Sequence, residues 1–241
     1  MNKQLLSINA DAKTIKGQKI GVLTGIMYLA PAKISGYQVC AFAKVAKCEN
    51  ACLYTAGRGG FNSVQKARIN KTKRFFEDRK AFFNDLVYSI NAVINKANKL
   101  GLKPAIRLNG TSDILWEKEA FTYKGQFYNN IMEFFPNTAF YDYTKYYNRD
   151  NLPANYDLTF SYSNVESFQK YNKLAQLNSA LSRIAVVFRS ADVIPAQFLD
   201  RPVINGDDTD VRFMDDKNVI IGLYAKGKGR KDNSGFIVDK V

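Results

Sequence analysis

Histidine is absent from the 241 residues of this chain. Its absence excludes Ser-His-Asp triads, Cys-His nucleophiles and histidine general bases. It also excludes zinc and non-haem iron centres that need imidazole ligands. Enzyme classes built on imidazole chemistry are therefore ruled out, and acid–base work would fall to other side chains such as paired carboxylates.

Cysteine is scarce, with residues only at positions 40, 48 and 52. An odd number of cysteines in so short a stretch does not make a disulfide framework. Long apolar runs are also missing: none approaches the 18 residues of a membrane span. The first seven residues lack the apolar core of a secretion signal. We therefore expect a soluble, cytoplasmic protein with no membrane partner.

Positive charge, in contrast, is abundant. Lys and Arg number 35 against 22 Asp and Glu, a formal net charge of +13. Such an excess favours phosphate-rich partners through steering and counterion release, so a nucleic acid or nucleotide is a candidate partner. A well-solvated basic surface is the alternative interpretation.

Strand-like and helix-like segments alternate along the chain, which predicts an α/β fold with a mostly parallel sheet. Apolar residues at three- and four-residue steps predict a helix over about 62–99. We expect one domain over residues 1–241, with a short N-terminal extension of about residues 1–18. The interval after the fifth strand, which holds the acidic turn 206–210, is long for a loop. The predicted strands are 21–29, 103–109, 139–143, 157–161, 184–188 and 219–224.

The three cysteines follow the first predicted strand, at the sheet edge where α/β barrels carry their chemistry. Clustered thiolates in an intracellular protein are usually metal ligands. Structural zinc takes four ligands, whereas a [4Fe–4S] cluster on three thiolates leaves one iron open for a substrate or cofactor. Cys40, Cys48 and Cys52 are therefore candidate ligands of an iron–sulfur cluster. Zinc completed by a carboxylate or water, or three small core residues, are the alternatives.

Other segments suggest anion contacts. Glycine-rich turns let backbone N–H groups approach an anion, and a flexible basic loop follows the last strand. An ordinary turn and a solvated loop are the alternatives. A basic run at 66–80 is interpreted as the solvated face of its helix, with contact to a nucleic-acid backbone as the alternative. Arg107, in an apolar strand, needs an acidic partner or a bound anion. The anion or phosphate candidates are Arg58, Gly59, Gly60, Lys226, Lys228, Arg230 and Lys231.

Four segments resemble the bacteriophage "gene product 88" domain family, and the resemblance as a whole spans roughly residues 8 to 238. The segments run from Cys40 to Gly59, from Arg107 to Ile114, from Phe140 to Lys145 and from Lys231 to Phe236. The resemblance implies a bacteriophage or prophage context, and hence the cytoplasm of the host cell.

More distantly, the layout is similar to radical S-adenosylmethionine enzymes. That similarity implies a partial (β/α)6 TIM-like barrel with mostly parallel strands. In those enzymes three cysteines after the first strand hold the cluster, and a Gly-Gly-Glu turn after the second strand binds the cofactor's amino group. The cysteine spacing here is x7 then x3, where x3 then x2 is usual, and the turn reads Asn-Gly-Thr. The implied cofactor-binding residues are Asn109, Gly110, Thr111, Ser112 and Asp113.

The resemblance implies that the reduced cluster cleaves S-adenosylmethionine to a 5′-deoxyadenosyl radical, which abstracts hydrogen from a substrate. The basic charge suggests a nucleic acid or nucleotide as that substrate. The alternative is a non-catalytic protein that binds nucleic acid or belongs to the virion, with a structural metal or no metal. The sequence identifies no catalytic residue.

Overall fold

The computed structural model describes residues 3–9 and 12–239. In this part of the chain, nine strands form one sheet in the order β1-β2-β3-β6-β7-β8-β11-β10-β9, and β4 and β5 form a separate hairpin. The sheet strands are β1 (Leu6–Ile8), β2 (Val22–Met27), β3 (Lys103–Arg107), β6 (Ala139–Thr144), β7 (Tyr156–Ser161), β8 (Arg183–Phe188), β9 (Gln197–Phe198), β10 (Arg201–Asn205) and β11 (Ile220–Tyr224). The other elements are β4 (Phe121–Tyr123), β5 (Gln126–Tyr128), α1 (Ala12–Lys19), α2 (Asn62–Glu77), α3 (Arg79–Lys99), α4 (Ile131–Phe134) and α5 (Gln169–Leu177).

The six predicted strands are β2, β3, β6, β7, β8 and β11, which lie side by side and parallel in chain order. The predicted mixed α/β fold with a mostly parallel sheet is therefore confirmed. All six residues of β2 are buried, as expected for a strand covered on both faces. The long interval after β8 is not a plain loop, because it contains β9 and β10.

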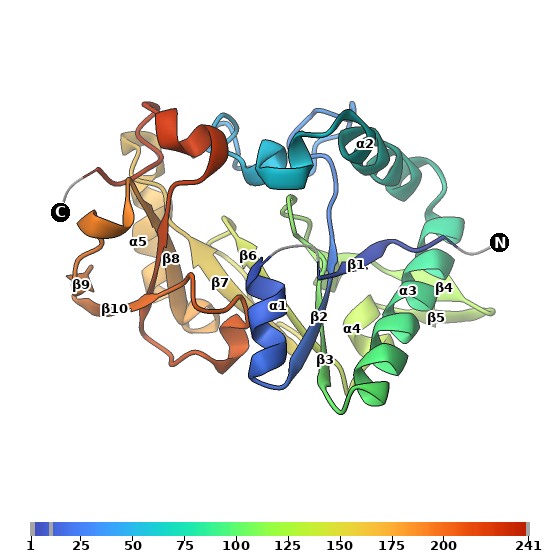
Figure 1. The fold of residues 1–241 in the computed structure, drawn as a ribbon. Helices are drawn as coiled ribbons and strands as arrows, with labels where there is room; N and C mark the ends of the chain where they lie inside the picture. Colours follow the sequence, from blue (N-terminus) through green and yellow to red (C-terminus); the bar gives the residue numbers. More distant parts are fainter. Residues whose placement is uncertain (1–2, 10–11, 240–241) are drawn as a thin grey trace.

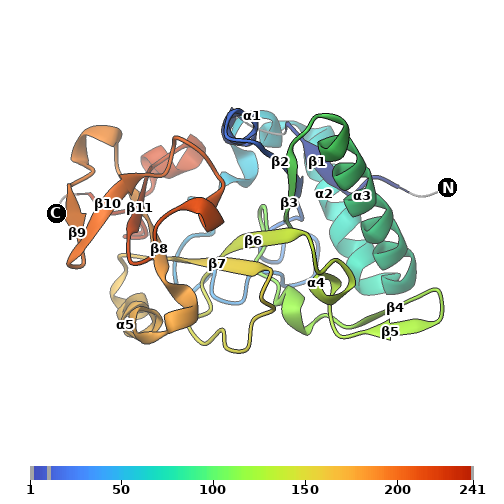
Figure 2. The same cartoon turned by 90° about the horizontal axis from the view of Figure 1, so that it is seen from below.

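The sheet curves but does not close, so the predicted barrel geometry is not found. Figure 2 shows the strands following an open arc with α1 at its gap. Lys13 Nζ donates to Gly206 O at 2.9 Å, and Gly17 packs against Val211 and Val22. The gap between the ends of the arc is thus filled by α1 and residues 206–211. Residues 1–18, expected as an extension, contribute β1 and part of this filling helix.

The main hydrophobic core includes the buried side chains through which α3 packs on β2 and β3, and Figure 1 shows α3 beside these strands. The fully buried side chains of Phe82, Leu86, Ile90 and Val93 follow the predicted helical spacing. The single predicted helix is broken at Asp78, whose φ of −141° is not helical and whose carboxylate accepts from Ala81 N at 3.3 Å. None of the described helices has the length and apolarity to span a bilayer.

Candidate functional site

A cavity of about 970 Å³ lies at the carboxyl ends of the parallel strands. Its lining includes residues at or next to the carboxyl ends of five parallel strands and the loops that follow β2 and β3. This is the edge at which parallel α/β sheets bind their ligands. The strand residues at this edge are Arg107, Tyr143, Thr144, Ser161, Val187, Leu223 and Tyr224.

All three cysteines line this cavity, and all three are free thiols. Cys40 Sγ lies 3.9 Å from Thr111 O, and Cys48 Sγ lies 3.8 Å from Ala43 O. Burial raises the pKa of Cys40 to about 12 and that of Cys52 to about 11, and the charge of neighbouring thiolates adds to both shifts. The thiols are therefore protonated at neutral pH, and the cluster of cysteines is not a ready nucleophile.

The three thiols line one cavity but are not arranged as ligands around a common metal position. Among the described residues, no three or more Cys, Asp or Glu side chains are grouped closely enough to hold a metal ion. All three cysteines nevertheless line the same cavity. The cavity is lined by three sulfur donors that are not gathered around one point, so the loop that carries them would have to rearrange to hold a metal.

The predicted cofactor turn, residues 109–113, also lines the cavity. The side chain of Asn109, however, is engaged within the protein: its Oδ1 accepts from Ser112 Oγ at 2.8 Å and from Trp116 Nε1 at 3.0 Å. Gly110 allows close approach to β2, because a Cβ there would lie 2.6 Å from Met27 O. Thr111 Oγ1 donates to Leu29 O at 2.5 Å. Most of the turn therefore serves the architecture of the site.

Asp113 and Lys145 are the charged groups beside Cys40 and Cys48. Asp113 Oδ2 accepts from the backbone N of Lys145 at 2.8 Å, and burial raises the pKa of Asp113. Burial lowers the pKa of Lys145, whose Nζ donates to Ser161 O at 2.9 Å. Lys145 is not among the site residues predicted from the sequence. The one signal for it was its position directly after a buried strand.

Of the seven anion candidates, three line the cavity and four do not. Arg58, Gly59 and Lys226 line the cavity, whereas Lys228, Arg230 and Lys231 are exposed in the short helix Gly227–Lys231. Gly60 is exposed beside the cavity turn. The backbone N–H of Gly59 donates to Ala56 O at 3.0 Å, so it is already used within the chain.

The family model described as "Gene product 88" matches residues 3–240. The chain belongs to the gene product 88 family. Neither the curated proteins nor the solved structures contain a match. The resemblance to the gene product 88 family is thus confirmed over nearly the whole chain, and the distant similarity to radical S-adenosylmethionine enzymes stays a prediction.

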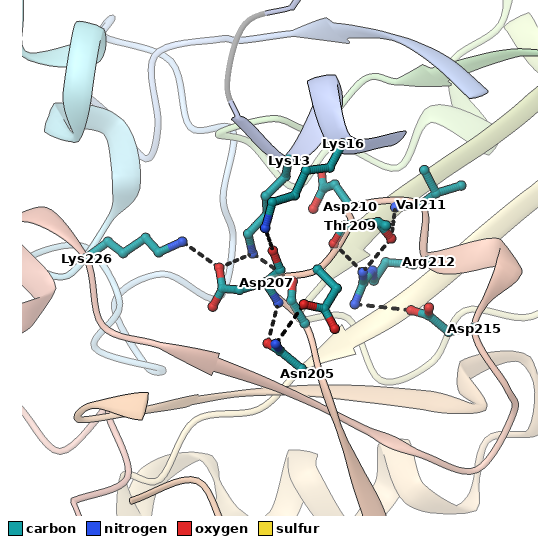
Figure 3. Close-up of polar contacts among 12 residues, drawn as sticks. Lys13, Lys16, Asn205, Asp207, Thr209, Asp210, Val211, Arg212, Asp215 and Lys226 are labelled. Carbon is teal, nitrogen blue, oxygen red and sulfur yellow. Dashed lines mark hydrogen bonds and ion pairs between the residues drawn. The ribbon is translucent and has the colours of Figure 1, made fainter. Parts of the chain in front are cut away.

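In this member of the gene product 88 family, one wall of the cavity is a network of paired charges. Arg107 Nη1 lies 2.5 Å from Asp210 Oδ2, which answers the expectation that this buried cation needs an acid. Asp207 Oδ1 lies 2.9 Å from Lys13 Nζ and 2.5 Å from Lys226 Nζ (Figure 3). Burial opposes ionisation of Asp207, yet hydrogen bonds from Lys226 and Lys13 hold its pKa below the usual range. We call these five residues the paired wall.

The wall formed by α2 and the turn before it is different. Arg58, Arg68 and Lys71 line the cavity there, and no described carboxylate forms an ion pair with any of them. Arg68 and Lys71 belong to the basic run that we interpreted as a solvated helix face, but Arg68 is only 8% exposed. We call these three residues the unpaired wall.

Proposed function

We propose that this protein is an iron–sulfur enzyme. Cys40, Cys48 and Cys52 would hold a [4Fe–4S] cluster with one open iron, and S-adenosylmethionine would bind in the adjoining cavity. The observation that carries the proposal is that every cysteine of the chain lines one cavity at the carboxyl ends of parallel strands that follow one another in chain order.

The donor set suits such a cluster chemically. Three thiolates without imidazole satisfy three irons and leave one open. Because the free thiols are protonated at neutral pH, cluster binding would release protons, and the incoming positive charge would relieve the repulsion between thiolates. No described group is already arranged around a metal ion, so we expect the cysteine loop to become more ordered on binding.

When bound, such a cluster supplies an electron and an open coordination position. The residues of the chain would do the rest of the work. Asp113 offers the carboxylate best suited to an ammonium group of a cofactor, since the Asn109 side chain is occupied by Ser112 and Trp116. Apolar lining from residues such as Phe42, Ala185 and Val187 would exclude water from a reactive intermediate.

The test is anaerobic purification followed by iron, sulfide and zinc analysis, with EPR of the reduced protein before and after addition of S-adenosylmethionine. We expect about four irons per chain and a spectrum that changes with the cofactor. Cys40→Ser, Cys48→Ser and Cys52→Ser should each lose most of the iron, whereas Lys44→Ser, an exposed change in the same loop, should keep it. Full iron in all three cysteine variants would refute the proposal.

A second candidate is a non-catalytic protein that binds nucleic acid, alone or in the virion. The net charge of +13 favours it. For this candidate we expect the purified protein to contain zinc or no metal, and its affinity for nucleic acid to fall steeply with salt concentration. A variant with all three cysteines changed to serine would then bind nucleic acid as well as the natural protein does.

A further inference from the structure

Arg68 is a buried cation that the fold does not neutralise. Its side chain lies over the rings of Tyr28 and Tyr54, with the guanidinium carbon 4.8 Å and 5.3 Å from their centroids. Nη1 donates to Tyr54 O at 2.9 Å, and Nε is buried with no hydrogen-bond partner among the described residues. Ring faces and one carbonyl do not cancel a full charge, so a buried arginine of this kind is costly without an anion.

Lys71 lies one helical turn further along α2 and lines the same cavity. Its Nζ donates to Leu5 O at 3.1 Å, which leaves the charge without a carboxylate. Burial, and then the charge of Arg68, lower the pKa of Lys71 to about 8. Two cations that repel each other on one turn of helix are stabilised by an anion placed between them.

The turn before α2 makes room for this pair. A Cβ at Gly59 would lie 2.3 Å from Tyr54 O and 3.1 Å from Arg68 Nη1, so the glycine leaves room for this carbonyl and for the guanidinium that donates to it. Arg58, exposed at the same turn, adds a third cation to the lining. Gly59 thus makes room for the Arg68 guanidinium.

We propose that Arg68 and Lys71, with Arg58 beside them, form a subsite that binds the phosphate group of a small phosphorylated ligand. The buried Arg68 and the half-buried Lys71, neither of them paired with a carboxylate, match the double negative charge of a phosphate monoester, and arginine presents paired donors to phosphate oxygens. A cavity of about 970 Å³ accommodates a ligand of nucleotide size. The subsite goes beyond the proposed iron–sulfur function and needs no cluster.

The experiment is a calorimetric titration of the full chain with inorganic phosphate, AMP and adenosine. Phosphate and AMP should bind saturably, with adenosine at least about ten-fold weaker than AMP. Binding of AMP without phosphate binding would indicate recognition of the whole nucleotide, which supports the subsite provided that adenosine is weaker. Equal affinity for AMP and adenosine, or no saturable binding of either anion, would overturn the proposal.

Matched variants decide which cations are responsible. R68M/K71M should weaken AMP binding roughly 10- to 100-fold. K66M/K73M removes the same charge from the exposed side of the same helix and should change it less than about three-fold. If R68M/K71M does not fold, as judged by the fluorescence of Trp116, K71M alone must weaken AMP binding. Equal affinities for AMP in the wild type, K66M/K73M and the folded subsite variant would refute the assignment.

The same titration in the C40S/C48S/C52S variant separates the two proposals. Retained AMP binding in this variant, without iron in the natural protein, would leave the subsite standing while the iron–sulfur function fails. Loss of AMP binding in R68M/K71M with a full complement of iron would confirm the subsite independently of the cluster.

Discussion

The two charged walls of the cavity differ in whether their cations are paired with carboxylates. On the paired wall, Arg107 faces Asp210, and Lys13 and Lys226 share Asp207. On the unpaired wall, Arg58, Arg68 and Lys71 face no described carboxylate. Both walls line the same space and bury cations, so burial alone does not separate them.

The difference assigns the two walls different roles. The acids of the paired wall lie in residues 206–211, which fill the gap of the open sheet with α1. Their ion pairs therefore hold the ends of the arc together. A buried cation without an internal partner forms no ion pair that could hold the fold together. Its presence is better explained by an anion that binds from outside. We expect the paired wall to govern stability and the unpaired wall to govern binding.

Breaking the paired wall should have the largest effect. Asp210→Asn leaves Arg107 buried with its main partner neutral, and we expect it to lower the free energy of unfolding by about 3–5 kcal/mol. The matched control is Glu119→Gln, which removes the acid of the more exposed pair with Arg79 and should cost under about 1 kcal/mol. Urea denaturation measures both. Equal losses would show that the Arg107–Asp210 pair has no special part in closing the gap.

Asn109 extends the comparison to the cofactor turn. Asn109→Ala removes the acceptor for Ser112 Oγ and Trp116 Nε1, and should lower the free energy of unfolding by about 2–3 kcal/mol. Asn91→Ala, an exposed asparagine on α3, should change it by less than about 0.5 kcal/mol. The fluorescence of Trp116, the chain's only tryptophan, should shift in the first variant only. An unchanged spectrum would contradict the role of Asn109 as the hydrogen-bond acceptor that holds Ser112 and Trp116 in place.

The contrast between the walls explains what the sequence could and could not predict. The six strands were predictable because their apolar residues report burial on both faces directly. The gap-filling role of α1 was not, because nothing in its own pattern says that Lys13 meets Asp207. Likewise, helical spacing places Arg68 and Lys73 on α2, but only the packing of the preceding turn shows that Arg68 is covered and Lys73 is not.

The functional site, too, could be predicted from the sequence only in part. The three cysteines line one cavity, as their closeness in the sequence leads one to expect, but whether they bind a metal stays a prediction. The need of Arg107 for an acid followed from its strand, yet Asp210, 103 residues away, could be named only from the fold. The break at Asp78 was hidden because the apolar spacing continues across it, while the helix itself changes direction.

Lys71 gives the unpaired wall a pH signature. Its pKa is about 8 in the folded protein against an ordinary value of 10.5, so between these values the unfolded chain binds more protons and stability rises with pH. The rise should be on the order of 1–3 kcal/mol. Lys71→Met should remove it, whereas Lys73→Met, exposed on the same helix, should keep it. Urea denaturation at pH 7.5 and pH 10.5 compares them, and a parallel rise in both variants would contradict the assignment.

Arg58 should have the smallest effect on the fold and thus separates binding from stability. Because its side chain is exposed at the cavity turn, Arg58→Ala should change the free energy of unfolding by less than about 0.5 kcal/mol. An exposed cation near a phosphate still attracts it through solvent, so affinity for AMP should fall roughly two- to five-fold. Arg230→Ala, exposed in the helix Gly227–Lys231, is the matched control and should leave that affinity unchanged. If the two variants weaken AMP binding equally, the attraction comes from the overall charge of +13. Arg58 would then make no specific contribution to phosphate binding.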